Sequence, residues 1–115
     1  MREYHKRRMK MKRFIVALSF SVRLYMSDSL KDKRRMRQKI ATGLKNSFNL
    51  SIKETADHEL LNYITFTAAY VALDAREGEE FVEKCRRAVE EIALGEGELA
   101  RYDWDMINYS HEQDF

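Results

Sequence analysis

Five basic residues just after Ser29 are the part of this sequence whose types and spacing could do chemistry. They are Lys31, Lys33, Arg34, Arg35 and Arg37. Ser29 and Asp32 match a helix-capping pattern, which places these cations in the first turns of a helix. Each cation is unfavourable there by roughly 0.3–1 kcal/mol, because the helix dipole is positive at this end. The segment therefore predicts contact with an anionic partner, since guanidinium groups and free helical amides both bind phosphate oxygens.

The angular positions of these cations divide them into two groups. At about 100° per residue, an apolar stripe runs through Met36, Ile40 and Leu44. The opposite arc holds Lys31, Arg34, Arg35, Lys39 and Lys45. Lys33 and Arg37 fall within the apolar arc instead. Either their apolar stems lie along the rim of a sheet with the charge in water, or they extend past the sheet edge toward a phosphate.

The other reactive residue types give no catalytic or metal-binding pattern. His58 stands between Asp57 and Glu59, but adjacent side chains on a turn diverge, and no second histidine has ligand spacing to them. Cys85 is in phase with an apolar helical stripe, which indicates a buried structural thiol. Phosphate-binding loops and nucleophile elbows are absent from the sequence. We therefore expect a non-enzymatic protein without a metal or cofactor.

Charge is distributed unevenly along the chain. Residues 1–39 contain 14 of the 21 Lys/Arg and 3 of the 19 Asp/Glu, a net charge of +11. Residues 40–115 contain 7 and 16, a net charge of −9. This asymmetry predicts either a basic surface for nucleic acid or two blocks that neutralise each other in the fold.

Size and composition are typical of one small folded domain. The chain has 115 residues, 44% of them hydrophobic, and 35% are charged. Cys85 is the only cysteine, so no intrachain disulfide is possible, which fits a reducing cytoplasm. The most apolar run, 14–26, is too short for a membrane span and is interrupted by polar residues. We expect a cytoplasmic protein that does not enter a membrane.

Hydrophobic periodicity predicts an alternation of strands and helices. In chain order we expect a strand at 13–26, a helix at 29–48, strands at 49–56 and 63–73, a helix from Asp74 to a stop at Gly95 or Gly97, and a strand at 98–107. The order β-α-β-β-α-β predicts an α+β, ferredoxin-like fold, in which a four-stranded antiparallel sheet has two helices on one face. We also expect Trp104 to point into the core.

The two ends of the chain are expected to lie outside this domain. Residues 1–12 are basic and show no apolar period, so we expect a disordered arm, and translation could also start at Met9 or Met11. Residues 13–107 form the domain, and 108–115 form a loose polar tail.

The most specific pattern in the sequence is the run SLKDKRR at 29–35, followed by NSFNLSIKET at 46–55. Together with the 57–60 turn and an acidic second helix, it resembles the YlxP-like family of small bacterial proteins, a domain of unknown function. The resemblance covers about residues 13–107. It implies a ferredoxin-like fold, a cytoplasmic bacterial protein and an association with RNA or the ribosome.

This sequence departs from the family pattern at three positions. Leu61 stands where the family has tryptophan, Asn62 where it has glutamine, and Arg37 where it has an apolar residue. A family role that depends on the tryptophan is therefore not expected in this chain.

Two hypotheses follow for the function. The first is an RNA or ribosome-associated binding module that uses the five basic residues of the first helix. The alternative is a protein–protein interaction or homo-oligomeric module, which would use the open sheet face or an edge strand. Base stacking on the open face is not favoured, because 62–68 lacks the glycine-aromatic RNA-binding signature and Asp103 and Asp105 would make that face negative.

Overall fold

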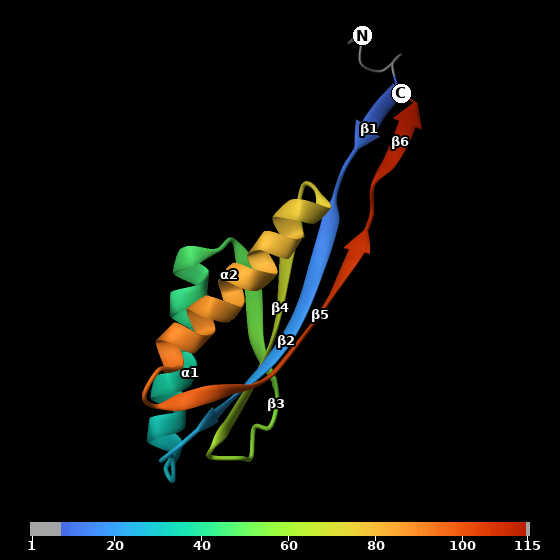
Figure 1. Cartoon of the computed structure of the whole chain (residues 1–115). Coiled ribbons are helices and arrows are strands. Elements are labelled where there is room, and N and C mark those ends of the chain that lie inside the picture. Colours follow the sequence, from blue (N-terminus) through green and yellow to red (C-terminus); the bar gives the residue numbers. More distant parts are fainter. Residues whose placement is uncertain (1–7, 115) are drawn as a thin grey trace.

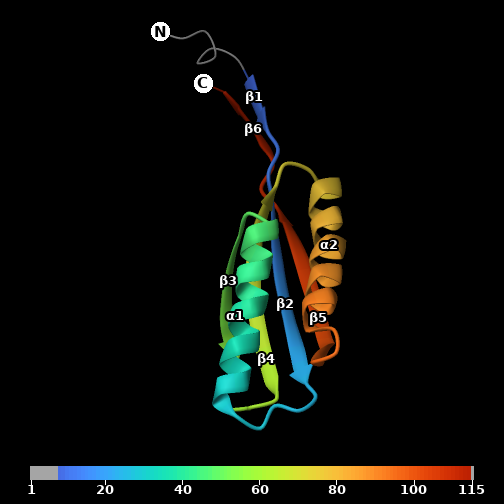
Figure 2. The same cartoon turned by 90° about the vertical axis from the view of Figure 1, so that its left-hand side faces the viewer.

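An antiparallel sheet with two helices on one face forms the body of the protein, as the computed structural model shows (Figures 1 and 2). The structure describes residues 8–114, with side chains for 12–110. The elements are β1 (Arg8–Met11), β2 (Phe14–Leu24), α1 (Leu30–Ser47), β3 (Leu50–Ala56), β4 (Tyr63–Ala72), α2 (Ala75–Ala93), β5 (Gly97–Asn108) and β6 (His111–Asp114).

The main sheet has the strand order β3-β4-β2-β5, and every neighbouring pair is antiparallel. The two middle strands are β2 and β4, and β3 and β5 are the edges. α1 packs on the β3–β4 side of the sheet and α2 on the β2–β5 side (Figure 2). The predicted ferredoxin-like fold is confirmed, and the predicted element boundaries differ from the observed ones by two residues or fewer.

The core forms where the apolar face of the sheet meets the apolar stripes of the helices. Alternate residues of β2 from Val16 to Leu24 are at most 5% exposed, as the period-two pattern requires. α1 contributes its predicted stripe, and the aromatic ring of Phe81 on α2 stacks on that of Tyr70 at 4.0 Å between centroids. The core therefore consists of residues whose spacing already indicated burial.

Side-chain caps fix where both helices begin. The Ser29 hydroxyl accepts a hydrogen bond from the Asp32 amide at 3.2 Å, and the Asp74 carboxylate accepts one from the Glu77 amide at 2.7 Å. The Glu77 carboxylate in turn accepts from the Leu73 amide at 3.2 Å. Both predicted caps are confirmed, and each satisfies a helical amide that has no partner within the helix.

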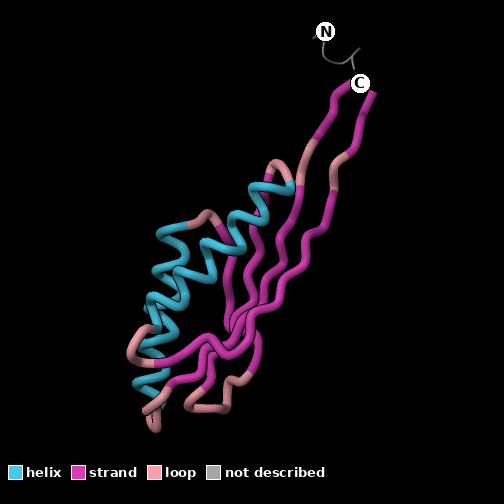
Figure 3. Tube along the Cα trace, viewed as in Figure 1, coloured by secondary structure: helices cyan, strands magenta, loops and turns pink. Residues whose placement is uncertain are grey.

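Both ends of the chain differ from our expectation. Where we expected a disordered arm and a loose tail, β1 and β6 pair as a two-stranded ribbon that projects beyond the sheet (Figure 3). Met11 pairs with His111 and Phe14 with Asn108, so the ribbon continues the β2–β5 register. The antiparallel pairing of β2 with β5 thus brings the two ribbon strands together. Residues 1–7 of the expected arm lie outside the described residues.

The prediction that Trp104 belongs to the core is wrong. Its side chain is on the helix side of β5, as expected, and its register partner Leu18 is 1% exposed. Trp104 itself is 45% exposed. The reason is its place on an edge strand, where the rim of the sheet is covered only in part.

Replacing Gly97 by alanine is expected to destabilise the protein by roughly 1–3 kcal/mol, the usual cost of overpacking. A Cβ at Gly97 would lie 2.5 Å from the backbone oxygen of Arg23, which cannot move without shifting β2. Gly43→Ala is the matched control. Its Cβ would meet only the flexible end of Ile92, and alanine favours a helix by about 1 kcal/mol.

Urea unfolding of the two variants measures this difference. An equal loss of unfolding free energy in both would contradict the account of the Gly97 contact.

Candidate nucleic-acid interface

α1 is the basic helix of this protein and α2 the acidic one. α1 has seven Lys/Arg and one acidic residue, whereas α2 has four Lys/Arg and six Glu. The helices lie over different halves of the sheet (Figure 2), so the basic residues of α1 are on the β3–β4 side of the molecule. This side therefore has the more positive electrostatic potential.

Lys33, one of the five predicted site residues, is buried and does not reach the surface. Its side chain is 1% exposed, and its ammonium group donates to the backbone oxygens of Asp57 at 2.8 Å, Leu60 at 2.6 Å and His58 at 3.3 Å. The three donors of the ammonium group are thus used by the turn between β3 and β4. Lys33 is therefore a structural residue, and the prediction that it binds nucleic acid needs correction.

The turn that accepts these bonds has an unusual backbone. Asp57 has φ 58°, in the left-handed region, and its carboxylate accepts from the Thr65 hydroxyl at 2.5 Å. This conformation lets successive carbonyl groups of the turn point toward one ammonium group. The predicted solvated turn is confirmed, since Asp57, His58 and Glu59 are exposed, but its backbone has a structural role that the sequence did not reveal.

Glu54 is the counter-ion of this region. Its side chain is 9% exposed and lies 3.4 Å from the Lys33 nitrogen, 2.9 Å from Arg37 and 3.5 Å from His58 Nδ1. Burial by itself raises the pKa of Glu54, but the hydrogen bond from Arg37 and the charge of Lys33 bring the pKa below its usual value. Glu54 therefore stays ionised at neutral pH and binds Arg37 to the β3 side of the sheet.

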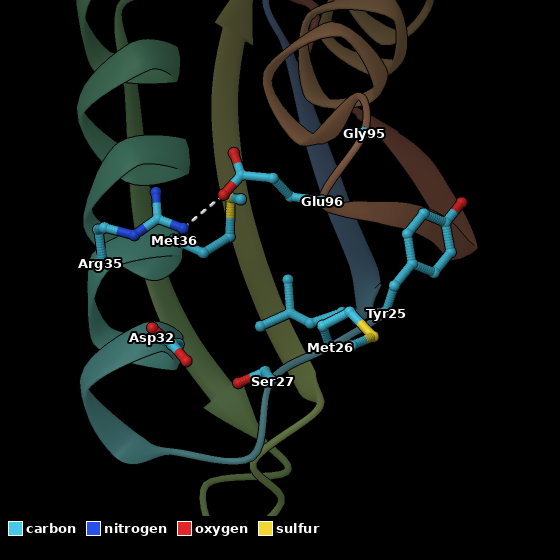
Figure 4. Close-up of a pocket in the computed structure, with 9 residues that line it drawn as sticks. Tyr25, Met26, Ser27, Asp32, Arg35, Met36, Gly95 and Glu96 are labelled. Carbon is cyan, nitrogen blue, oxygen red and sulfur yellow. Dashed lines mark hydrogen bonds and ion pairs between the residues drawn. The ribbon is translucent and has the colours of Figure 1, made fainter.

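Arg35 lies on the other side of α1, where a second acidic residue holds it. Its guanidinium group is paired with Glu96, which also accepts a hydrogen bond from Lys39 at 3.1 Å (Figure 4). The hydrogen bond from Arg35, and then that from Lys39, lowers the pKa of Glu96. Glu96 belongs to the turn between α2 and β5, so these pairs connect the first half of α1 to the end of α2.

A cavity of about 250 Å³ adjoins this pair, between the β2–α1 loop and the α2–β5 turn (Figure 4). Met36 and Leu24 form its apolar part, and Asp32 lies at its rim. This volume is just below the range of about 300–1,000 Å³ that is typical of small-molecule sites. None of the residues that line the cavity is histidine or cysteine.

Lys31 and Arg34 are the cations of the predicted set that remain free. Both are exposed, and their side chains make no ion pair with the part of the chain that the structure describes. Arg34 also lines a groove between α1 and β3, together with Arg37, Gln38 and His58. The floor of this groove is formed by Ala41, Ile52 and Phe66. The exposed cations thus follow one side of α1 from its first turn to the groove.

The structure does not bring the five predicted residues into one cluster. Lys33 and Arg37 meet at Glu54, Arg35 turns toward Glu96, and the other two face water. The sequence pattern indicated the cations but neither of their acidic partners. The phase of Lys33 with the apolar stripe was a signal of its burial, whereas nothing in the sequence pointed to Glu54 or Glu96.

The remaining reactive groups agree with a structural role. Cys85 is fully buried, as predicted, and burial raises the pKa of its thiol to about 11. Within the described residues, no group of three His, Cys, Asp or Glu is arranged to hold a metal ion. Neither described helix combines the length and apolar character that crossing a membrane requires.

Comparison with known proteins gives a family without an assigned function. A family model described as "Protein of unknown function (DUF503)" matches residues 15–103. No protein with a curated description matches the chain.

Solved structures support the fold alone. A de novo designed protein, Foldit4, is 12% identical with a TM-score of 0.51, over 83% of this chain and 96% of its own. The Bacillus subtilis YXEP protein, a dinuclear metal-binding peptidase of the M20 family, is 13% identical with a TM-score of 0.56, over 91% of this chain but 28% of its own. A dimeric ferredoxin-like protein of unknown function from Thermobifida fusca is 11% identical with a TM-score of 0.48, over 84% of this chain and 91% of its own.

Lys33→Met is expected to lower the free energy of unfolding by about 3 kcal/mol, because it removes the cation from three turn carbonyls and leaves the buried Glu54 carboxylate with Arg37 alone. Lys31→Met, two residues earlier and exposed, is the matched control and should change it by less than about 0.5 kcal/mol. Urea unfolding at neutral pH measures both values. Similar stability of the two variants would show that the Lys33 contacts add nothing.

The pH dependence of stability is expected to depend on Glu54. Its pKa is lower in the folded than in the unfolded state, so its contribution is present above about pH 4.3, the ordinary value, and is lost as the pH falls through the folded pKa. Glu54→Gln removes this ionisation. The unfolding free energy of the variant should therefore fall less than that of the wild type between about pH 5 and pH 3. Parallel curves in urea titrations would contradict this assignment.

Proposed function

The chain belongs to the DUF503 family of proteins of unknown function, and we propose that it is a non-enzymatic RNA or ribosome-associated binding module that uses the exposed cations of α1. The solvent exposure of Lys31 and Arg34 supports this proposal most directly. Their charges are exposed on a strongly basic helix and are not neutralised by any described residue. Such cations gain by displacing counterions from a phosphate backbone.

Arg37 extends this binding surface into the groove between α1 and β3. Its side chain is 38% exposed, and one of its nitrogens is bound to Glu54. A guanidinium group has five N–H donors, so Arg37 can hold Glu54 and a phosphate oxygen at once. Arg35 contributes less, because its guanidinium group is already paired with Glu96.

The groove favours contact with the phosphate backbone over contact with bases. The one aromatic ring that lines it, Phe66, is 2% exposed and belongs to the core. Base stacking on this surface would need an exposed aromatic side chain. We therefore propose recognition of structured RNA through its phosphates, with little dependence on base sequence.

We also propose that this protein is YlxP-like and is located in the cytoplasm. The resemblance of the 29–35 and 46–55 segments to YlxP-like proteins, together with the single buried cysteine, supports a bacterial protein of the cytoplasm.

The double variant K31E/R34E is expected to weaken RNA binding at least tenfold, because it removes two phosphate contacts and adds two repulsive charges. Its salt dependence should also be shallower by about two units of log–log slope, about one for each lost contact. Filter binding to a structured ribosomal RNA fragment at several salt concentrations measures both quantities.

The matched control is K84E/R87E, which changes the net charge equally at two exposed positions of α2. This variant should keep most of the affinity. Equal weakening by both double variants would show that net charge rather than the α1 surface causes binding. Unchanged binding by K31E/R34E would overturn the proposal.

A further inference from the structure

The sheet face opposite the helices carries small side chains along the centre of its two middle strands. Both helices lie on the other side (Figure 1). The two middle strands present to this open face Ala17, Ser19, Ser21, Thr65, Thr67 and Ala69. None of these side chains extends far from the backbone, so another surface could approach the centre of the face closely.

The hydroxyl groups of this face bind one another. Ser19 and Thr67 are hydrogen bonded at 2.9 Å, Thr55 and Thr67 at 2.7 Å, and Ser21 and Thr65 at 2.7 Å. Removing a hydroxyl from water is costly only where no other partner replaces the water. Because these groups already have partners in the protein, this face can be covered without leaving them unsatisfied.

Apolar side chains continue the face toward the terminal ribbon. Ile15, Val71 and Ile107 lie side by side on three neighbouring strands. Val71 is 61% exposed and Ile107 is 41% exposed, so much of their apolar surface is in contact with water. Covering this row would remove that surface from water, at a gain of about 25 cal/mol per Å².

In the middle of the face, charges lie on the two edge strands. Nearer the β2–α1 loop the face also carries Arg23 of β2, which pairs with Glu98, and Arg101 of β5, which pairs with Asp103. One row across the sheet contains Lys53 on β3, Thr67, Ser19 and Asp103 on β5. The next row ends in Asp105 on β5. In these two rows the β3 edge is therefore positive and the β5 edge negative, with neutral residues between them.

We propose that the open sheet face binds a second copy of this chain, with a twofold axis parallel to the strands. This axis exchanges the two edges, so β3 of each copy faces β5 of the other. Lys53 then faces the partner's Asp103 on both sides of the dimer, and the small residues of the middle strands face each other. An axis perpendicular to the strands would instead place like charges together, which is unfavourable.

The size of the face fits such a dimer. Four strands about 4.8 Å apart and about ten residues long, at 3.4 Å each, give a face of roughly 600 Å² per copy. Two copies would bury roughly 1,200 Å², at the lower end of specific interfaces. The α1 helices lie on the outside of this dimer, so the proposed RNA surface stays open and either proposal can fail without the other.

Sedimentation velocity of the full chain between 1 and 200 μM tests the dimer. We expect a monomer–dimer equilibrium that Ala69→Arg shifts to the monomer, because a long cation in the middle of the face prevents contact. Ala75→Arg, on an exposed position of α2, is the matched control and should dimerise as the wild type does. Circular dichroism checks that both variants fold. A wild-type chain that stays monomeric at 200 μM, or an Ala69→Arg variant that still dimerises, overturns the proposal.

Cross-linking tests the direction of the axis. Facing sheets lie about 10 Å apart, so a short bismaleimide should join K53C to D103C when the two variants are mixed. Neither variant alone should cross-link, because the two Lys53 positions of the dimer are separated by about three further strand spacings. Cys85 is fully buried and does not compete. Cross-linking of K53C to itself would overturn the proposed axis.

Discussion

The buried ammonium group of Lys33 is the contact on which the basic side of this molecule depends. It joins the first turn of α1 to three carbonyl oxygens of the β3–β4 turn and lies beside Glu54 on β3. A cation is stable inside a protein only where hydrogen bonds and an opposite charge replace its water. Those groups come from a turn whose Asp57 has a left-handed backbone, so helix, turn and edge strand are fixed together.

This contact also explains why a helix can begin with so many cations. Glu54 and Glu96, far apart in the sequence, each hold cations of α1 on opposite sides of the helix. Ion pairs with Glu54 and Glu96 offset the unfavourable interaction of these cations with the helix dipole. No local sequence pattern predicts these pairs. Several of the cations at the start of α1 therefore have a structural role, and of the five predicted site residues only Lys31 and Arg34 make no ion pair with the described residues.

The placement of both helices on one face gives the protein two separate surfaces. The outer side of α1 is basic and exposed, whereas the centre of the open sheet face carries small side chains whose hydroxyl groups bind one another. We propose the first surface for a phosphate backbone, because Lys31 and Arg34 make no ion pair with the described residues. The second surface suits an apolar partner, because its hydroxyl groups already have hydrogen-bond partners within the protein.

The sequence by itself determined the elements, both helix caps and the ferredoxin-like order, because periods of 2 and 3.6 residues record which side of each local segment meets the core. It also placed Lys33 in phase with Met36 and Ile40. Only the tertiary structure decided that Glu54 and three turn carbonyls receive that cation, that Trp104 stays half exposed, and that the chain ends pair. These outcomes depend on which strands become edges and on contacts between distant residues, and hydrophobic periodicity contains no information about either.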